Sequence, residues 1–114
     1  MAATATFTSP AHAADAAHGK TIFQRCAICH RTDKDGGNGL GPNLFGVVNR
    51  KAASVAGFSY SAALKNSGLT WTPANLTKWV AHPSALVPGN RMAFAGLSDP
   101  AQQADVVAYL ATLK

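Results

Sequence analysis

Cys26-Ala27-Ile28-Cys29-His30 is the stretch from which the fold of this 114-residue chain can be inferred. It holds the chain's two cysteines, three positions apart, with a histidine directly after the second. Two thiols about one helical turn apart can each bond to one of the two vinyl groups of a haem, and the next imidazole can then reach the iron. The C-x-x-C-H pattern therefore predicts covalent attachment of one haem through Cys26 and Cys29, with His30 as the proximal iron ligand.

Three other roles for the two cysteines fit the sequence less well. A redox-active C-x-x-C pair favours a strand–helix–strand context, which the surrounding sequence does not show. A structural zinc site needs two further ligands at suitable spacing, and His12, His18 and His82 are scattered along the chain. A disulfide across two intervening residues would close a loop too short to add much stability.

The methionines point to a second iron ligand. Apart from Met1, the chain has one methionine, Met92. A soft thioether favours reduced iron and raises the reduction potential. Pro88 and Gly89 precede it and favour an extended, turning backbone that can bring one side chain against a flat cofactor. We therefore predict Met92 as the sixth ligand, with a bis-histidine site through His82 as the alternative.

Four segments in a fixed order give the chain a resemblance to the class I cytochromes c of mitochondria and bacteria. They are CAICH at 26–30, GPNLFG at 41–46, GLTW at 68–71 and PGNRMAFAG at 88–96, and AYL follows at 108–110. The resemblance covers residues 15–114. It implies one all-α cytochrome c domain over these residues, with helices and loops wrapped around a single covalently bound haem c.

The overall composition agrees with one globular domain. Apolar residues make up 47% of the chain and charged residues 13%, so the composition is that of a globular rather than a disordered chain. No run of 18 apolar residues occurs, so the sequence predicts no transmembrane segment.

The first fourteen residues differ from the rest. Residues 1–14 carry no charged side chain, and Ala11-His12-Ala13 fits the small-x-small pattern before a signal-peptidase cut. We interpret them as the remnant of a secretory signal, with a disordered N-terminal extension as the alternative. Haem attachment in the resembled family occurs outside the bacterial cytoplasm. The resemblance therefore implies a periplasmic location, with the mitochondrial intermembrane space as the alternative.

Capping residues and apolar spacing predict four helices joined by loops, with no strand and no internal repeat. The expected helices span residues 16–29, 60–66, 73–82 and 100–114, with N-caps at Asp15, Ser59, Thr72 and Asp99. Residues 32–58 are glycine-rich and have little periodicity. Such a long segment without helices is unusual in a compact domain unless it packs on a cofactor. In the resembled family a glycine lets the first and last helices cross closely, and Gly19 would face Val106 and Tyr109 here.

The resemblance also implies roles for side chains around the haem. The Pro42 carbonyl would accept a hydrogen bond from the His30 ring, and Phe94 would shield the Met92 side. The implied cofactor-binding set is Cys26, Cys29, His30, Pro42, Arg50, Tyr60, Trp71, Trp79, Met92 and Phe94, of which Arg50, Tyr60 and Trp71 match positions that hold a haem propionate. Trp79 stands where many members have tyrosine, and Leu64 where mitochondrial members have an asparagine in a buried water network.

The charge of the chain bears on its partners. Ten Lys and Arg against five Asp give a formal net charge of +5, which favours redox partners with acidic docking faces. Arg25 and Arg91 match basic positions around the haem edge in the family, whereas Ser84 and Ala85 replace lysines of the mitochondrial pattern. The basic residues form no cluster, so a nucleic-acid partner is not expected.

The resemblance implies a soluble, monomeric, single-haem electron carrier that is not an enzyme. Such a carrier would take electrons from a quinol-oxidising complex and pass them to a terminal oxidase, a reductase or a photosynthetic centre. One alternative is a dedicated electron-acceptor cytochrome of a specific periplasmic dehydrogenase. Another is a haem peroxidase or gas sensor with an open sixth position on the iron.

Overall fold

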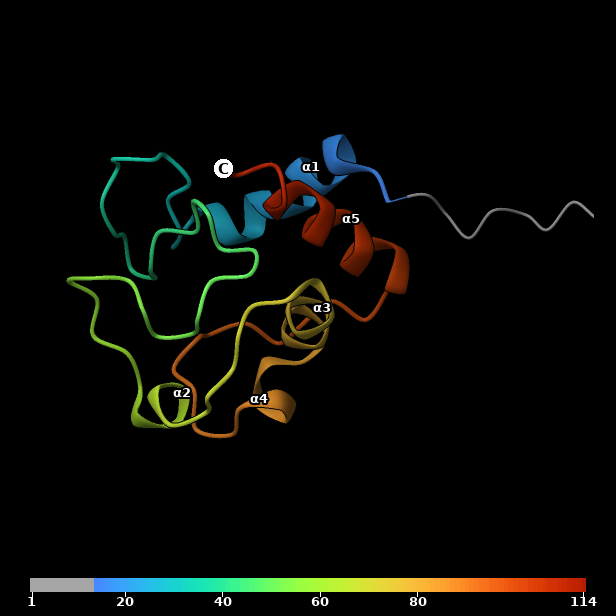
Figure 1. Ribbon diagram of the computed structural model, residues 1–114. Coiled ribbons are helices and arrows are strands. Elements are labelled where there is room, and N and C mark those ends of the chain that lie inside the picture. Colours follow the sequence, from blue (N-terminus) through green and yellow to red (C-terminus); the bar gives the residue numbers. More distant parts are fainter. Residues whose placement is uncertain (1–13) are drawn as a thin grey trace, which may run out of the picture.

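The computed structural model describes residues 14–114, and these residues form five helices joined by long loops (Figure 1). The helices are α1 (Ala16–Ala27), α2 (Ala62–Lys65), α3 (Pro73–Ala81), α4 (Pro83–Leu86) and α5 (Pro100–Leu110). Strand-like pairing in the described part of the chain is limited to an isolated antiparallel bridge between Lys51 and Thr70. The predicted all-α class is therefore confirmed. The interpretation of residues 1–14 lies, except for Ala14, outside the described residues.

Three helices begin where the capping residues predict. The side chain of Asp15 accepts hydrogen bonds from the backbone N–H groups of the first turn of α1, and Asp99 and Thr72 cap α5 and α3 in the same way. Pro73 and Pro100 occupy the first helical positions, where a fixed φ suits the helix and a missing N–H removes no hydrogen bond. These starts are set by local chemistry, which is why they could be inferred from the sequence.

Other boundaries differ from the predictions. The short helix α2 is capped by Ser61, whose Oγ accepts from the Leu64 N–H at 3.1 Å, so the predicted cap at Ser59 is wrong. Tyr60 precedes the helix, and its buried hydroxyl accepts a hydrogen bond from the Val55 N–H. Helix α1 ends at Ala27 and α5 at Leu110, both earlier than predicted.

Helix α4 was not predicted at all. Pro83 ends α3, as expected, but it also starts this new four-residue helix. The Nδ1 atom of His82 accepts a hydrogen bond from the Ala85 N–H at 3.2 Å and caps the helix. A histidine cap of so short a helix leaves little signal in the sequence, because apolar periodicity needs several turns to become visible.

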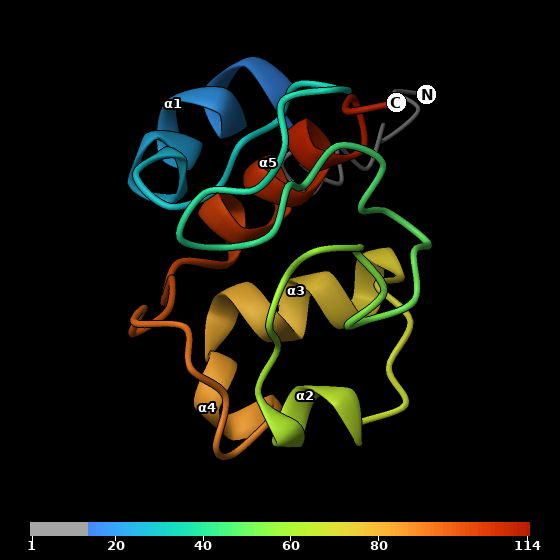
Figure 2. The same ribbon diagram turned by 90° about the vertical axis from the view of Figure 1, so that its left-hand side faces the viewer.

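Helices α1 and α5 cross in close contact, and both ribbon views show them packed on each other (Figures 1 and 2). Gly19 is buried at the crossing, and a Cβ atom built on it would overlap the backbone carbonyl oxygen of Asp105. The same Cβ would lie 3.0 Å from the Cβ of Tyr109. The rings of Phe23 and Tyr109 pack beside this point with centroids 5.2 Å apart. The predicted close crossing through Gly19 is confirmed.

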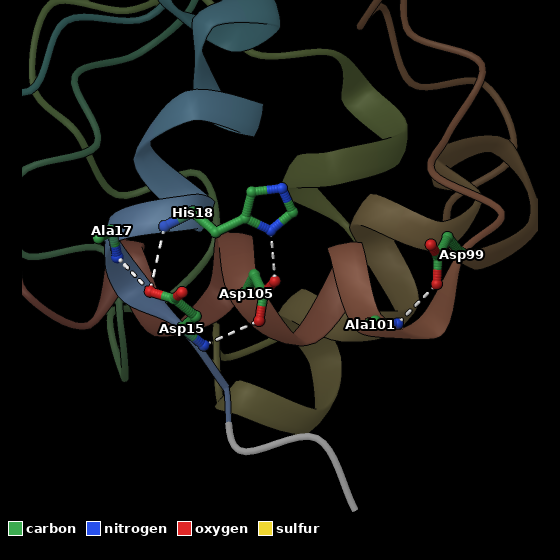
Figure 3. Close-up of polar contacts among 6 residues, drawn as sticks. All are labelled: Asp15, Ala17, His18, Asp99, Ala101 and Asp105. Atoms are coloured by element: carbon green, nitrogen blue, oxygen red, sulfur yellow. Dashed lines mark hydrogen bonds and ion pairs between the residues drawn. The ribbon is translucent and has the colours of Figure 1, made fainter.

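A buried carboxylate also ties the start of α1 to α5 (Figure 3). Asp105 has no exposed surface. Its Oδ1 accepts a hydrogen bond from the Asp15 backbone N–H at 2.8 Å, and its Oδ2 lies 2.7 Å from Nδ1 of His18. The carboxylate therefore holds both the cap residue and the first turn of α1 against the middle of α5.

The remaining helices pack below the crossed pair. In Figure 2, α2, α3 and α4 lie on one side of the molecule and α1 and α5 on the other. Both sides contribute to one hydrophobic cluster of buried residues, which includes Phe23, Leu76, Val80, Val106 and Leu110. None of the helices described here has the length and apolar character needed to cross a membrane.

Candidate haem-binding site

A cavity of about 580 Å³ is lined by residues of α1, α2, α3 and α5 and by the loops between them. This volume lies in the usual range for pockets that hold small molecules and cofactors. All ten predicted cofactor-binding residues line it, although they come from separate segments of the chain: Cys26, Cys29, His30, Pro42, Arg50, Tyr60, Trp71, Trp79, Met92 and Phe94. The fold thus brings the whole predicted set to one place.

The two cysteines lie at the end of α1, next to the cavity. The Cys29 and His30 N–H groups both donate to the Cys26 carbonyl, at 3.0 and 2.9 Å, so the chain continues to turn after the helix. This turn presents both sulfur atoms and the imidazole together. Neither cysteine is in a disulfide. Burial raises the pKa of the Cys26 thiol, since a thiolate would lose hydration there.

The His30 ring is oriented by a hydrogen bond. Its Nδ1 lies 2.7 Å from the Pro42 carbonyl oxygen, which can only accept, so Nδ1 carries the hydrogen and Nε2 keeps the free lone pair. Burial lowers the pKa of His30, because the charged imidazolium would be poorly solvated. The neutral ring is the form that binds a metal ion. A contact of this kind also makes the imidazole a stronger ligand.

Gly41 lies in close contact with the same ring. A Cβ atom on Gly41 would lie 2.5 Å from Cε1 of His30. We expect Gly41→Ala to push the imidazole away from Pro42 and to raise the reduction potential of the holoprotein by tens of millivolts. A weaker hydrogen bond makes the imidazole less basic and so stabilises ferric iron less, and a tenfold change in relative stability corresponds to about 59 mV.

A redox titration of the holoprotein checks this prediction. Gly37→Ala is the control, since Gly37 lies in the same loop with φ of 69° and no atom within 4 Å of an added Cβ. That variant strains the backbone without touching His30. Equal potentials for wild type and Gly41→Ala would contradict the prediction.

Met92 reaches the cavity from the loop between α4 and α5. Its N–H donates to Oδ1 of Asn90 at 2.9 Å, and the Asn90 amide donates to the Val87 carbonyl at 2.9 Å. At the far end of the loop, the Leu97 N–H donates to the Val80 carbonyl at 2.7 Å. The loop is therefore held at both ends. His82, the alternative ligand, is exposed, caps α4 and does not line the cavity.

Arg50 and Tyr60 bring hydrogen-bond donors to an otherwise apolar wall. Arg50 donates to the carbonyls of Phe45 and Asn43, both at 3.0 Å, which leaves three of its five N–H groups for other partners. The Tyr60 oxygen accepts from Val55, so its own hydrogen remains available. Burial lowers the pKa of Arg50. Such donors suit the carboxylates of a haem, which need partners when they are partly buried.

Two tryptophans form another part of the wall. Trp71 is buried, and its ring centroid lies 5.1 Å from that of Trp79 in an edge-to-face arrangement. Leu64 also lines the cavity. It stands where mitochondrial members of the resembled family have an asparagine in a buried water network. An aliphatic side chain offers no hydrogen bond to such water, so this part of the wall is apolar.

Some residues that line the cavity were not predicted. Phe58 lies edge-to-face with Tyr60, with ring centroids 4.8 Å apart. The signal was present in the sequence, because residues i and i+2 of an extended segment share a face. The further unpredicted lining residues include Leu40, Ala53, Ser59, Ser61 and Asn90. Single residues of this kind in loops give no pattern that distinguishes a cavity wall from a surface.

Comparison with known proteins gives one consistent result. A family model described as cytochrome c matches residues 16–114. The chain is 48% identical over 100 residues to cytochrome c2 of Rhodomicrobium vannielii, a match that covers 88% of this chain and 80% of the relative. It is 45% identical over 101 residues to cytochrome c of Chlamydomonas reinhardtii, covering 88% and 90%. Among solved structures, cytochrome cH from Methylobacterium extorquens aligns with a TM-score of 0.81 and 47% identity, over 86% of this chain and 98% of that one.

Proposed function

Because this chain belongs to the cytochrome c family and is a monohaem electron carrier, we propose that it carries electrons from a quinol-oxidising complex to a terminal oxidase, a reductase or a photosynthetic centre. One observation supports the site in particular. Ten residues that are predicted to hold the haem come from separate segments and all line one cavity. Relatives named cytochrome c2 in several bacteria support the role of electron carrier.

Different residues of the cavity would hold different parts of the cofactor. Covalently bound haem c supplies a one-electron iron couple. Cys26 and Cys29 would anchor it through thioether bonds, and His30 and Met92 would bind the iron. With both residues as iron ligands, the iron would have no open position for a substrate, and we propose that the protein is not an enzyme.

The remaining residues of the cavity wall would exclude water from the haem and pair with its carboxylates. Trp79 and Phe94 cover the Met92 side and exclude water, which favours the less charged, reduced state of a buried centre. Arg50, Tyr60 and Trp71 would hold the propionates of a bound haem. The Pro42 carbonyl keeps the His30 ring in one orientation and one tautomer.

We further propose that the protein acts in the periplasm as a monomer and meets partners with acidic docking faces. Arg25 and Arg91 line the same cavity as the predicted ligands, which supports a positively charged rim there. Opposite charge on a partner speeds association and orients the encounter.

A redox titration with visible spectra tests the ligand set. We expect the wild-type holoprotein to have a positive potential, a weak sulfur–iron absorption band near the red end of the oxidised spectrum, and no ready binding of carbon monoxide when reduced. Met92→Ala should lose the band, bind carbon monoxide and fall in potential by on the order of 0.1 V, since axial ligands tune haem potentials over about 0.8 V.

His82→Ala is the matched control. It removes the other candidate ligand and should leave the spectrum and the potential as in the wild type. The opposite pattern, an altered spectrum in His82→Ala and an unchanged one in Met92→Ala, would establish a bis-histidine site and overturn the assignment of Met92. Ready carbon monoxide binding by the reduced wild type would instead favour a sensor or a peroxidase.

A further inference from the structure

The loop of residues 87–99 joins α4 to α5 and carries Met92, and Figure 2 shows it running along one edge of the molecule. A soft, uncharged thioether favours reduced iron, so it is the weaker of the two proposed ligands when the iron is oxidised. A weak ligand stays bound when the protein holds it in place, because ordering a free loop would cost entropy. The contacts that fix this loop therefore bear directly on the bond between Met92 and the iron.

The near end of the loop is fixed to the core through Val87. Its side chain is buried, with 4% of the residue's surface exposed. Its carbonyl accepts two hydrogen bonds from Asn90, one from the backbone N–H at 3.2 Å and one from the side-chain amide at 2.9 Å. Gly89 lies inside this turn with φ of 88°, a conformation that glycine adopts without strain. Both the backbone and the side chain of Asn90 are thus placed relative to a buried residue.

The same Asn90 side chain also reaches forward to Met92. Its Oδ1 accepts a hydrogen bond from the Met92 N–H at 2.9 Å. A side-chain oxygen that binds the backbone N–H two residues later makes an Asx turn, a conformation that asparagine favours. One amide group therefore joins the carbonyl of buried Val87 to the backbone N–H of Met92, and both Asn90 and Met92 line the haem cavity.

The far end of the loop is fixed at a greater distance from Met92. The Leu97 N–H donates to the Val80 carbonyl at 2.7 Å, and the Leu97 carbonyl accepts from the Gln103 amide at 2.6 Å. A Cβ atom on Gly96 would overlap a backbone carbonyl oxygen at the end of α3. These contacts hold the loop as a whole against α3 and α5.

The segment between the two ends depends on Asn90. Within the part of the chain that the structure describes, residues 91–95 make one other hydrogen bond, from the Phe94 N–H to the Met92 carbonyl at 3.0 Å. That bond is internal to the segment and ties it to nothing else. The Asn90 side chain is therefore the hydrogen-bonding group that connects the backbone of Met92 to the rest of the described fold.

We propose that Asn90 is a positioning residue for the bond between Met92 and the iron. It holds the Met92 backbone, and this keeps the thioether at the iron when the iron is oxidised and the bond is weakest. The inference rests on the proposed function, because Asn90 can position the ligand only if Met92 is the ligand. If Asn90 served the turn alone, its loss would lower the free energy of unfolding without changing how easily Met92 leaves the iron.

The test measures how tightly the oxidised holoprotein binds added imidazole, followed by the loss of the sulfur–iron absorption band. Imidazole binds only to the fraction of molecules in which Met92 has left the iron, so its apparent affinity reports how well Met92 is held. Guanidinium unfolding of each variant is measured alongside, which separates a change in overall stability from a change at the iron.

Four variants distinguish the contacts. Asn90→Ala removes both side-chain hydrogen bonds, and Asn90→Ser restores an acceptor for the Met92 N–H, because a hydroxyl forms the same kind of turn more weakly. Gln103→Met removes the far-end contact with little change in size. Asn75→Ala is the matched control, since it loses a similar bond of 2.8 Å from its amide to the Thr70 carbonyl and does not line the cavity.

We expect Asn90→Ala to bind imidazole roughly tenfold more tightly than the wild type, the effect of losing hydrogen bonds of ordinary strength that favour the Met92-bound state. Asn90→Ser should lie between the two. Gln103→Met should change the affinity less than Asn90→Ala does, because its contact lies five residues from Met92. Asn75→Ala should bind imidazole as the wild type does, even where it unfolds at a lower guanidinium concentration.

Three outcomes would count against the inference. Wild-type imidazole affinity in Asn90→Ala, or in Asn90→Ser if the alanine variant does not fold, would overturn it and leave the proposed function intact. An equal rise in Asn90→Ala and Gln103→Met would also overturn it, because attachment of the whole loop would then be what matters. A wild type without the sulfur–iron band would overturn the assignment of Met92 as a ligand, and the positioning role with it.

Discussion

Gly19→Val is expected to destabilise the holoprotein by about 3 kcal/mol or more. The added Cβ would overlap the Asp105 carbonyl, and a backbone atom of a packed helix cannot rotate away as a flexible side chain can. The helices must therefore separate, which also disturbs the ring contact between Phe23 and Tyr109. Helix propensity alone predicts the opposite, because valine is a better helix former than glycine.

Guanidinium unfolding of the holoprotein measures this effect. Ala17→Val is the matched control: it puts the same side chain on an exposed position of α1 and should change stability by less than about 1 kcal/mol. An unchanged unfolding midpoint in Gly19→Val would mean that the two helices do not approach as closely in solution as the structure has them.

Asp105→Ala is expected to lower stability by about 3 kcal/mol, with Asp99→Ala as its comparison. Asp105 is fully buried and accepts hydrogen bonds from the Asp15 backbone N–H and from His18 (Figure 3). Hydrogen bonds to a charged group contribute about 1.5–3 kcal/mol each, and both are lost together. Asp99 lies on the same helix but is exposed and acts as an N-cap for Ala101, so its loss should cost only about 1 kcal/mol.

The same unfolding experiment compares the two variants, and His18→Ala separates the His18 contact of the carboxylate from its contact with the Asp15 N–H. His18 is half exposed, so its removal leaves the Asp15 contact in place and should cost less than the loss of Asp105. If Asp105→Ala and Asp99→Ala lowered the free energy of unfolding equally, the buried contact between α1 and α5 would contribute no more to stability than an ordinary N-cap.

Local chemistry explains which parts of the fold could be predicted. Asp15, Thr72 and Asp99 cap their own helices, and each is readable from the residues that follow it. The contact of Asp105 with the start of α1 could not be inferred in this way. Its partners lie about 90 positions away, and an aspartate in an amphipathic helix normally faces water.

The same distinction applies to the short helices and the site. Ser59 and Ser61 are equally good caps in sequence, and the burial of Tyr60, a tertiary effect, decides between them. The cofactor-binding set could be named because a resemblance supplied the roles, and C-x-x-C-H and Met92 also stood out by composition. Leu40 carried no such signal, because its place in the wall depends on how the long loop folds.

The size of the cavity has a consequence for the life of the polypeptide in the cell. Without the prosthetic group, the apolar side chains that line a space of about 580 Å³ would lose a packing partner, and such a loss is large beside the roughly 5–15 kcal/mol by which a typical domain is stable. A chain that never receives its prosthetic group should therefore not persist as an inactive carrier. It should remain an expanded substrate for proteases, and the amount of the protein that accumulates would report how well the maturation machinery works.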